Sequence, residues 1–372
     1  MASPLYFTTL VLSYVLIAVV VAIVPALGTG STRLTTTSSL EMEAEALLHT
    51  GWWRWDANHS LKHCEWQGIS CNEAGRVTRI DRTWFTLNGS IPPQIGAFSS
   101  LKYLILSLNS LTGSIPLGWG NLNSLKLLDL SHNQLTGPIP STLGNLTNLK
   151  LLDLSGNQIT GPIPSTLGNL TNLKLLDLSG NQITSPIPST LGSLTNLNLL
   201  DLSDNQITGH VPSTLGNLTN LNLLNLSRNQ ITGPTPSTLG KLTNLKDLDL
   251  SFNQITRAIP REIGNLKNLS DLNLSKNKLN GLVPSSLANL SRLSYLFLDS
   301  NHLEGPLPSQ IGNCSVLEGL YLSNNHIHGS IPFEVLTCPY ILDISHNFIE
   351  GEIPQQLITI FTSTFWILAT TI

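Results

Sequence analysis

Apolar and polar residues recur along most of the chain with a period of 24 residues. Residues 149–172 read LKLLDLSGNQITGPIPSTLGNLTN, and the next 24 residues repeat this text with two changes, Ser185 in place of Gly161 and Ser193 in place of Asn169. A period of this length predicts a stack of repeats, because each unit can bury its apolar face only against its neighbours. One asparagine marks each unit at this spacing, and a last one follows after 22 residues: Asn109, Asn133, Asn157, Asn181, Asn205, Asn229, Asn253, Asn277, Asn301, Asn325 and Asn347.

The first segment of each unit alternates between apolar and polar residues. Leu152 and Leu154 face one way, and Asp153 and Ser155 face the other, which predicts a strand with one buried face. Strands of successive units would lie side by side as a parallel sheet. Asn157 ends the strand, and its amide both donates and accepts hydrogen bonds. A ladder of such asparagines is therefore expected to satisfy backbone groups that the turns leave unpaired.

The rest of the unit predicts two further elements. Residues 159–164 form a shorter extended segment, and Leu167 and Leu170 face inward from a helical or 3-10 turn. The predicted fold is an α/β repeat solenoid, a curved superhelix with a parallel β-sheet on its concave side and helical or 3-10 turns on its convex side. About 12 coils are expected over residues 77–360, of which the first and the last are atypical.

Both ends of the chain are apolar. The run from Tyr6 to Leu27 precedes the first charged side chain, Arg33, and predicts a secretory signal peptide over residues 1–30. An uncleaved signal anchor is the alternative, since the run approaches the ~20 residues that span a membrane. Either segment directs the chain into the secretory pathway, to the cell surface and plasma membrane or to the extracellular space. Residues 361–372 form an apolar tail that is short for a transmembrane helix.

A short amphipathic helix is expected before the repeats. Apolar residues recur at helical spacing from Ser39 and the pattern ends near Gly51. The two serines at its start can cap the helix, and Glu41, Glu43 and Glu45 would lie in its first turn, where the helix dipole favours acids.

Two cysteines follow this helix in the sequence HCEWQGISC. Cys64 and Cys71 lie close together beside a tryptophan, which in a secreted chain favours a disulfide. A metal site formed with His63 is the alternative, but it lacks a fourth ligand. Residues 31–76 are accordingly interpreted as an N-terminal cap that covers the apolar edge of the first coil.

These motifs together carry a family resemblance. The helix, the CxWxGIxC cysteine pair and the sequence GRVTRI resemble the N-terminal cap of plant extracellular leucine-rich-repeat proteins, and the LxGxIP segments resemble their repeats. That family includes receptor-like kinases, receptor-like proteins and secreted glycanase inhibitors. The resemblance implies an extracellular recognition domain for a peptide or protein ligand, with a co-receptor or partner receptor kinase for signalling, because the kinase glycine loop, the HRD-type loop and the DFG motif are absent from this sequence.

Other function classes find no support in the sequence. No GxSxG, HExxH or P-loop motif is present, so the chain is not expected to be an enzyme or to hold a cofactor. Only 11% of residues are charged and the formal net charge is −4, which argues against a nucleic-acid partner. Two alternatives to a receptor ectodomain stay open, namely a secreted inhibitor of a cell-wall-degrading glycanase and a non-functional, truncated receptor fragment.

The candidate ligand contacts lie where copies of the repeat differ. The position just before each ladder asparagine varies even among otherwise nearly identical coils. This variation indicates either adaptation of these residues to a ligand or neutral sequence drift. From Lys246 onward, aromatic and charged residues replace the repeated ones, as at binding surfaces. The predicted concave binding residues are His132, Asp204, Arg228, Phe252, Lys276, Phe297 and Tyr321.

A row of aspartates recurs at the outward strand position of the coils. The row begins at Asp129 and Asp153, and it could bind a cation. We favour a structural interpretation without a metal, since Asp is the default residue of this repeat and lysines three positions earlier can partly neutralise it. These lysines are Lys126, Lys150, Lys174 and Lys246.

Glycosylation is expected at Asn-x-Ser/Thr sequons of a secreted chain. The predicted sites are Asn58, Asn88, Asn145, Asn169, Asn217, Asn289 and Asn313. The sequons at Asn225 and Asn273 fall on the concave sheet, where a glycan would obstruct a ligand, and we expect poor occupancy there.

Four positions depart from the repeat pattern. Arg82 stands where the first coil needs an inward leucine, so it requires a distorted coil or an acidic partner, and Phe85 replaces a ladder asparagine. Cys314 and Cys338 occupy an inward leucine column, where two buried thiols are favoured over a disulfide.

Overall fold

The computed structural model describes residues 37–53, 60–314, 316–336, 339, 341–351 and 365–367. Nearly all of them belong to one compact unit, Ser39–Ile372. The predicted signal peptide, residues 1–30, lies outside the described residues, and so does most of the predicted apolar tail.

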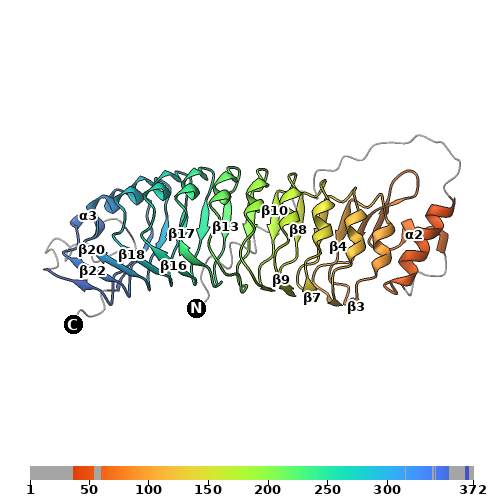
Figure 1. The fold of residues 1–372 in the computed structure, drawn as a ribbon, viewed down its shortest axis with the longest axis horizontal. Helices are drawn as coiled ribbons and strands as arrows, with labels where there is room; N and C mark the ends of the chain where they lie inside the picture. Colours follow the sequence, from red (N-terminus) through yellow and green to blue (C-terminus); the bar gives the residue numbers. More distant parts are fainter. Residues whose placement is uncertain are drawn as a thin grey trace. The chain divides into compact units, whose positions relative to one another are not determined.

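The main sheet runs through the whole unit and is parallel, as predicted, except for its first pair of strands (Figure 1). In most of its parallel pairs the register matches each residue with the one 24 positions later, so that Leu151, Leu175 and Leu199 lie side by side. Late in the sheet, Gly319 pairs with Ile341, which is 22 positions later. Its strands, in spatial order, are β1 (Ile69–Cys71), β2 (Val77–Asp81), β4 (Tyr103–Ile105), β6 (Leu127–Asp129), β8 (Leu151–Asp153), β10 (Leu175–Asp177), β12 (Leu199–Asp201), β13 (Leu223–Asn225), β15 (Asp247–Asp249), β17 (Asp271–Asn273), β19 (Tyr295–Phe297), β21 (Gly319–Tyr321), β23 (Ile341–Asp343) and β25 (Phe365–Ile367).

The shorter extended segments form two further parallel sheets. Most of their strands bury one apolar residue, such as Ile159, between exposed neighbours such as Gln158 and Thr160. One sheet contains β3 (Asn88–Ser90), β5 (Ser110–Gly113), β7 (Gln134–Pro138), β9 (Gln158–Gly161) and β11 (Gln182–Ile183). The other contains β14 (Thr232–Pro234), β16 (Gln254–Arg257), β18 (Lys278–Gly281), β20 (His302–Gly305), β22 (His326–Gly329) and β24 (Phe348–Ile349).

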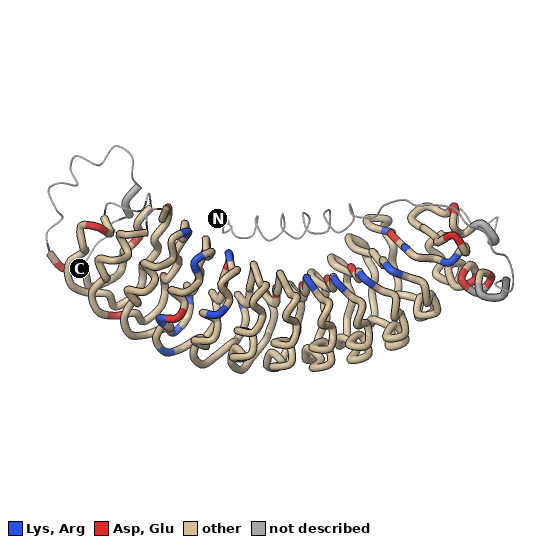
Figure 2. Tube along the Cα trace, turned by 90° about the horizontal axis from the view of Figure 1, so that it is seen from above, with Lys and Arg blue, Asp and Glu red and all other residues tan. Residues whose placement is uncertain are grey.

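Short 3-10 turns close the coils on the convex side, and Figure 2 shows how the row of coils bends within this unit. The turn η5 buries Leu167 and Gly168, and the burial of Leu167 confirms the inward position predicted for it. The turns are η2 (Pro93–Ala97), η3 (Leu117–Asn121), η4 (Ser141–Asn145), η5 (Ser165–Asn169), η6 (Ser189–Ser193), η7 (Ser213–Asn217), η8 (Ser237–Lys241), η9 (Arg261–Asn265), η10 (Ser285–Asn289) and η11 (Ser309–Asn313), and the short helix α3 (Phe333–Leu336) takes their place in a late coil.

The predicted asparagine ladder is present. The side-chain nitrogen of Asn157 donates to the carbonyls of Leu130 (3.0 Å) and Leu154 (3.1 Å), and its oxygen accepts the backbone N–H of Leu135 (3.0 Å). Each asparagine therefore ties its own coil to the preceding one. Since buried backbone groups without partners cost about 1–3 kcal/mol each, the ladder fixes the spacing of the coils.

The N-terminal cap contains α2 (Thr37–His49) and the 3-10 helix η1 (Ser60–Glu65). The helix begins earlier than predicted, so that Ser39 lies inside it and its first turn holds no acidic residue. The expected serine cap and dipole interaction are therefore wrong. Instead, the buried Glu43 carboxylate pairs with Arg76 (2.6 Å) and accepts the backbone N–H of Val77 (2.9 Å), which joins the helix to the first coil.

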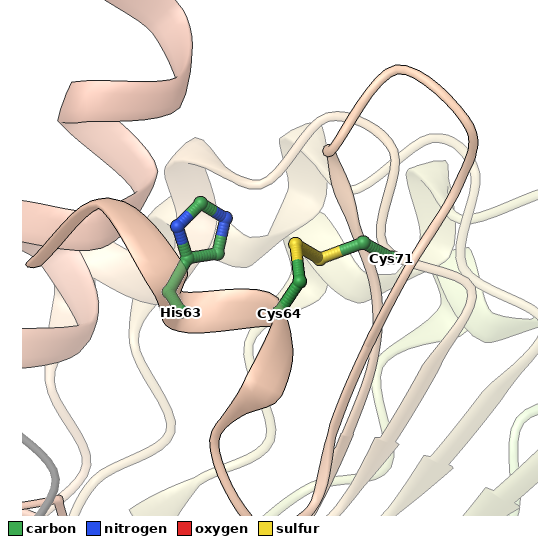
Figure 3. A group of neighbouring side chains, drawn as sticks. All are labelled: His63, Cys64 and Cys71. Carbon is green, nitrogen blue, oxygen red and sulfur yellow. A yellow bond between two sulfur atoms is a disulfide. The ribbon is translucent and has the colours of Figure 1, made fainter. Parts of the chain in front are cut away.

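The predicted disulfide between Cys64 and Cys71 is present, with a Cα–Cα distance of 5.6 Å (Figure 3). His63 lies next to it, and its Nε2 is 3.3 Å from the carbonyl oxygen of Gly75. Since the two sulfur atoms are bonded to each other, they do not offer the thiolates that the alternative metal site required.

The first coil accommodates its two unusual residues. The buried Arg82 side chain donates to the carbonyls of Trp52 (2.8 Å) and Gln67 (3.3 Å), and its guanidinium lies 3.9 Å from the Phe85 ring centroid. Asn109 of the next coil still accepts the backbone N–H of Phe85 at 3.0 Å. The ladder thus begins one coil after Phe85.

Candidate ligand-binding face

The variable position before each ladder asparagine has a left-handed backbone. Its φ is 51° at His132, 50° at Asp204, and 52° at each of Arg228, Phe252 and Lys276. A side chain at such a φ costs about 1–2 kcal/mol relative to glycine, which is the residue found in two of the coils. We call the column of these side chains the corner column. Its backbone is held by hydrogen bonds to the next coil, such as the 3.1 Å bond from Phe252 N–H to the Ser275 carbonyl. The fold therefore presents this column of side chains in fixed directions.

Four of the predicted binding residues form one continuous row across neighbouring coils. The Phe252 ring, 37% exposed, has the Arg228 guanidinium 4.5 Å from its centroid and the Lys276 ammonium 4.3 Å from it. Arg228 in turn lies 3.7 Å from the Asp204 carboxylate. Cation–π contacts at such exposed sites contribute about 0.5–1 kcal/mol each, enough to order the row. His132 stands apart from these residues, because the two intervening coils have only glycine at this position.

The other two predicted residues belong to an aromatic ladder on the sheet. The rings of Phe297 and Tyr321 stack with centroids 4.6 Å apart, and Tyr295, which the sequence analysis missed, lies 6.1 Å from Phe297. The Tyr295 hydroxyl donates to the Glu318 carboxylate at 2.5 Å, and this bond is the main cause that raises the pKa of Tyr295 to about 12. A side chain at Gly319 would begin 2.8 Å from the Tyr321 ring and 2.9 Å from that of Tyr295, so glycine makes room for both rings.

An acidic pair next to this ladder was also missed. Asp247 and Asp271 face each other across β15 and β17. Burial and then the Asp271 charge raise the pKa of Asp247 to about 7, and Lys246 counteracts them in part. A signal was available, since both acids replace the leucine that fills this strand position in five consecutive earlier coils, at Leu127, Leu151, Leu175, Leu199 and Leu223.

The aspartates of the earlier coils are not the exposed row that was expected. Asp153 is only 3% exposed, and its carboxylate accepts both the N–H (2.9 Å) and the hydroxyl (2.7 Å) of Ser155. Equivalent serine bonds hold Asp129, Asp177 and Asp201, and burial raises the pKa of Asp201 to about 8. Across the described part of the chain these carboxylates form no salt bridge with the predicted lysines. Serine hydroxyls, not lysines, partner them.

In the two sequons on the concave sheet, the asparagine side chain donates a hydrogen bond to a neighbouring aspartate. The side-chain nitrogen of Asn225 donates to Asp201 at 3.2 Å, and that of Asn273, a residue only 8% exposed, donates to Asp249 at 3.3 Å. The other described sequons expected to be glycosylated have exposed side chains: Asn88, Asn145, Asn169, Asn217, Asn289 and Asn313. Asn58 lies outside the described residues, and their glycosylation stays a prediction.

Cys314 is buried, and its sulfur lies 3.9 Å from the carbonyl oxygen of Leu287. Cys338 is outside the described residues, so the state of this cysteine pair also stays a prediction. Among the described residues, no helix is both long and apolar enough to cross a membrane.

Comparison with known proteins agrees with this architecture. The family model of the leucine-rich repeat region matches residues 140–258 and 235–331, and that of the Leucine Rich Repeat matches residues 100–122 and 124–146. The ectodomain of the Arabidopsis receptor kinase HAESA, solved with an extended IDA peptide hormone, is 34% identical, with a TM-score of 0.73 over 86% of this chain and 56% of that one.

Two further solved structures are similar. The ectodomain of GASSHO1/SCHENGEN3 from Arabidopsis thaliana, in complex with CASPARIAN STRIP INTEGRITY FACTOR 2, is 33% identical, with a TM-score of 0.71 over 88% of this chain and 46% of that one. A plant ice-binding protein is 31% identical, with a TM-score of 0.59 over 72% of this chain and 88% of that one. The chain thus spans about half the length of the receptor ectodomains it matches. It belongs to the leucine-rich-repeat family, in the plant extracellular type that these receptor ectodomains represent.

Proposed function

We propose that the chain recognises an extracellular peptide or protein through the C-terminal half of its concave face and acts in signalling with a partner receptor kinase. One observation carries the proposal: from Asp247 onward the outward strand positions change from repeated leucine and aspartate to a mixed aromatic and charged surface. A few residues provide most of the binding energy at protein interfaces, and tyrosine and arginine are enriched among them. The similar HAESA ectodomain, solved with a peptide hormone, supports this choice of ligand.

The scaffold suits such a role because it holds these side chains in place before a ligand arrives. The sheet pairing and the asparagine ladder are the same under Phe252 and Phe297 as in the regular coils. A preorganised surface loses little conformational entropy on binding, so that more of the contact energy appears as affinity.

The proposal is tested by affinity capture with the full chain secreted from plant cells. We expect the triple variant Phe252→Ala, Phe297→Ala, Tyr321→Ala to retain its ligand about tenfold less well than the unchanged chain. A matched control replaces three exposed hydroxyl residues of the turn side that belong to no sequon: Ser165→Ala, Ser189→Ala and Thr195→Ala. Equal capture by both variants would contradict the proposal. Co-purification of a receptor kinase with the chain only when the ligand is present tests the proposed signalling with a partner kinase.

Cell fractionation separates this function from the two alternatives raised by the sequence. A soluble extracellular pool that blocks a cell-wall glycanase would favour an inhibitor. The absence of any stable protein would favour a non-functional fragment. A plasma-membrane pool that binds a ligand favours the receptor role.

Ice binding is a second candidate function, supported by the regular outer face of the two smaller sheets. Six consecutive coils expose or half-expose a glutamine and a threonine on either side of a buried aliphatic residue, without a Lys, Arg, Asp or Glu among them: Gln134, Thr136, Gln158, Thr160, Gln182, Thr184, Gln206, Thr208, Gln230, Thr232, Gln254 and Thr256. Such an uncharged lattice suits an uncharged crystal surface, and one similar structure is that of a plant ice-binding protein.

Inhibition of ice recrystallisation tests this candidate. The secreted chain should slow crystal growth, and Thr160→Tyr with Thr184→Tyr should abolish the effect by disturbing the lattice. The concave variant Phe297→Ala serves as a control and should keep full activity. A wild-type chain without any effect on ice would remove the candidate.

A further inference from the structure

On the basis of the proposed function, we propose that the C-terminal half of the concave face selects a ligand segment with an arginine or lysine side chain, seated between the Asp247–Asp271 pair and the aromatic ladder of Tyr295, Phe297 and Tyr321. The two acids lie opposite each other in β15 and β17, and Tyr295 follows them in the same row of the sheet. The site thus has a charged end and an aromatic end, as a long basic side chain does.

Charge complementarity is the first argument. Six carboxyl groups belong to the strands of this region or border them: Asp247, Asp249, Asp271, Asp299, Glu318 and Asp343. In the part of the chain that the structure describes, none of them forms a salt bridge. Lys276, the nearby lysine of the corner column, is placed over the Phe252 ring. Lys246, Arg228 and Lys276 lower the pKa of Asp247, Asp249 and Asp299 in part, but the six acids outnumber these three cations. A cationic ligand group would therefore balance the remaining negative charge.

The second argument is the position of the Asp247–Asp271 pair. Directly opposite residues on neighbouring strands are about 5 Å apart, and like charges there repel each other. The Asp271 carboxylate accepts the Ser270 hydroxyl at 2.7 Å, and a hydrogen bond with Asp271 helps to hold the proton on the Asp247 carboxyl until its pKa is exceeded. A guanidinium presents several N–H donors in a fixed fork and can bond to both carboxylates at once, which replaces their repulsion with two attractive contacts.

The aromatic ladder supplies a wall for the stem of the same side chain. Glu318 and Asp271 lie near enough to Tyr295 to raise its pKa, and Asp343 acts in the same way on Tyr321, so the rings stand among negative charges. Arginine and lysine bury their methylene stems against such apolar surfaces while the charged end contacts acids. The Tyr295 and Tyr321 rings close over Gly319, 2.9 Å and 2.8 Å from where a Cβ would stand, so the rings form a continuous wall.

Binding should then depend on pH. The groups around Asp247 are Lys246 before it in the chain, Asp249 on its own strand, Asp271 on β17 and the uncharged Leu223 on β13. Since the Asp247 carboxyl loses its proton near pH 7, affinity for a cation should rise as pH increases through this value. Asp247→Asn should remove that part of the pH dependence.

Selection of displayed random 12-residue peptides on the full secreted chain tests the proposal. We expect the selected peptides to be enriched in arginine or lysine. A synthetic copy of the best one should bind about tenfold more weakly to the double variant Asp247→Asn, Asp271→Asn, the loss of one charge-assisted contact. Replacing its basic residue by uncharged citrulline should weaken binding to the unchanged chain to the same extent.

The matched control is Glu304→Gln with Glu350→Gln, which removes two exposed carboxylates away from the main sheet and should leave binding within about twofold. Thermal unfolding verifies that each variant is folded. Peptides that lose binding with Phe297→Ala and Tyr321→Ala but show no basic enrichment would overturn this inference and leave the proposed function intact. Peptides indifferent to all these variants would overturn both.

Discussion

The coils from β6 to β13 and the coils from β15 to β23 share one scaffold but expose different side chains. In the first region the outward strand positions repeat Leu and Asp or Asn, whereas in the second they include Asp247, Tyr295, Gly319 and Tyr321. Main-sheet register and ladder bonds are the same in the two regions up to β21, and only the pairing of β21 with β23 is two residues shorter. The comparison teaches that inward residues determine the coil and leave the outward positions free to vary.

The largest expected effect comes from removing a ladder asparagine in either region. Asn181→Ala and Asn277→Ala each abolish three bonds to backbone carbonyls of successive coils and leave one buried N–H without its acceptor. We expect each to lower the free energy of unfolding by about 4 kcal/mol, measured by denaturant titration.

Asn196→Ala is the control, since its exposed amide makes a single bond to the Thr171 carbonyl and should cost about 1 kcal/mol or less. If Asn277→Ala lowered the free energy of unfolding much less than Asn181→Ala does, the two regions would not share one scaffold, which would contradict the comparison.

The second effect concerns the close approach of the turns. A Cβ at Gly168 would lie 2.5 Å from the carbonyl oxygen of Thr190 in the next coil, so Gly168→Ala should cost about 1–3 kcal/mol through overpacking. Gly118→Ala is the matched control, because a Cβ there meets no atom within 4 Å. A melting temperature of Gly168→Ala equal to that of the control would show that the turns are not tightly packed.

The inward half of each coil could be predicted from the sequence, because it repeats and its environment is another copy of itself. The strands, the asparagine ladder and the 3-10 turns follow from residues such as Leu152, Asn157 and Leu167. Outward positions depend on side chains from neighbouring coils, which no single repeat reveals. Asp153 looked exposed but is buried with Ser155, and Tyr295 joins the aromatic ladder only because Gly319 leaves space beside it.

The left-handed corner was likewise out of reach of the sequence pattern. Glycine in two coils was a signal for a positive φ, but arginine, phenylalanine and lysine at the same position concealed it. The start of the helix at Thr37 was also missed. The acids predicted for its first turn lie further along the helix, where Glu43 accepts a backbone hydrogen bond from the first coil.

A smaller effect concerns the pH dependence that the second region owes to Asp247. The pKa of the Asp247 carboxyl rises from its ordinary value of 3.8 to about 7 on folding, mainly through burial. The folded state therefore binds the extra proton, and its stability should fall as pH rises between these two values. Unfolding measured at pH 5 and pH 8 should show a smaller loss for Asp247→Asn than for the unchanged chain. An identical loss in both would mean that this acid is not perturbed.

The smallest effect leaves stability unchanged and concerns glycan occupancy. Asn273 is buried on the concave sheet with its amide nitrogen donating to Asp249, whereas Asn289, at the end of the turn η10 later in the same coil, has an exposed side chain. Mass spectrometry of the secreted chain should find a glycan on Asn289 in most molecules and on Asn273 in few. Because a glycan on Asn273 would stand beside Phe297, its partner in the sheet register, full occupancy there would place the ligand elsewhere on the molecule.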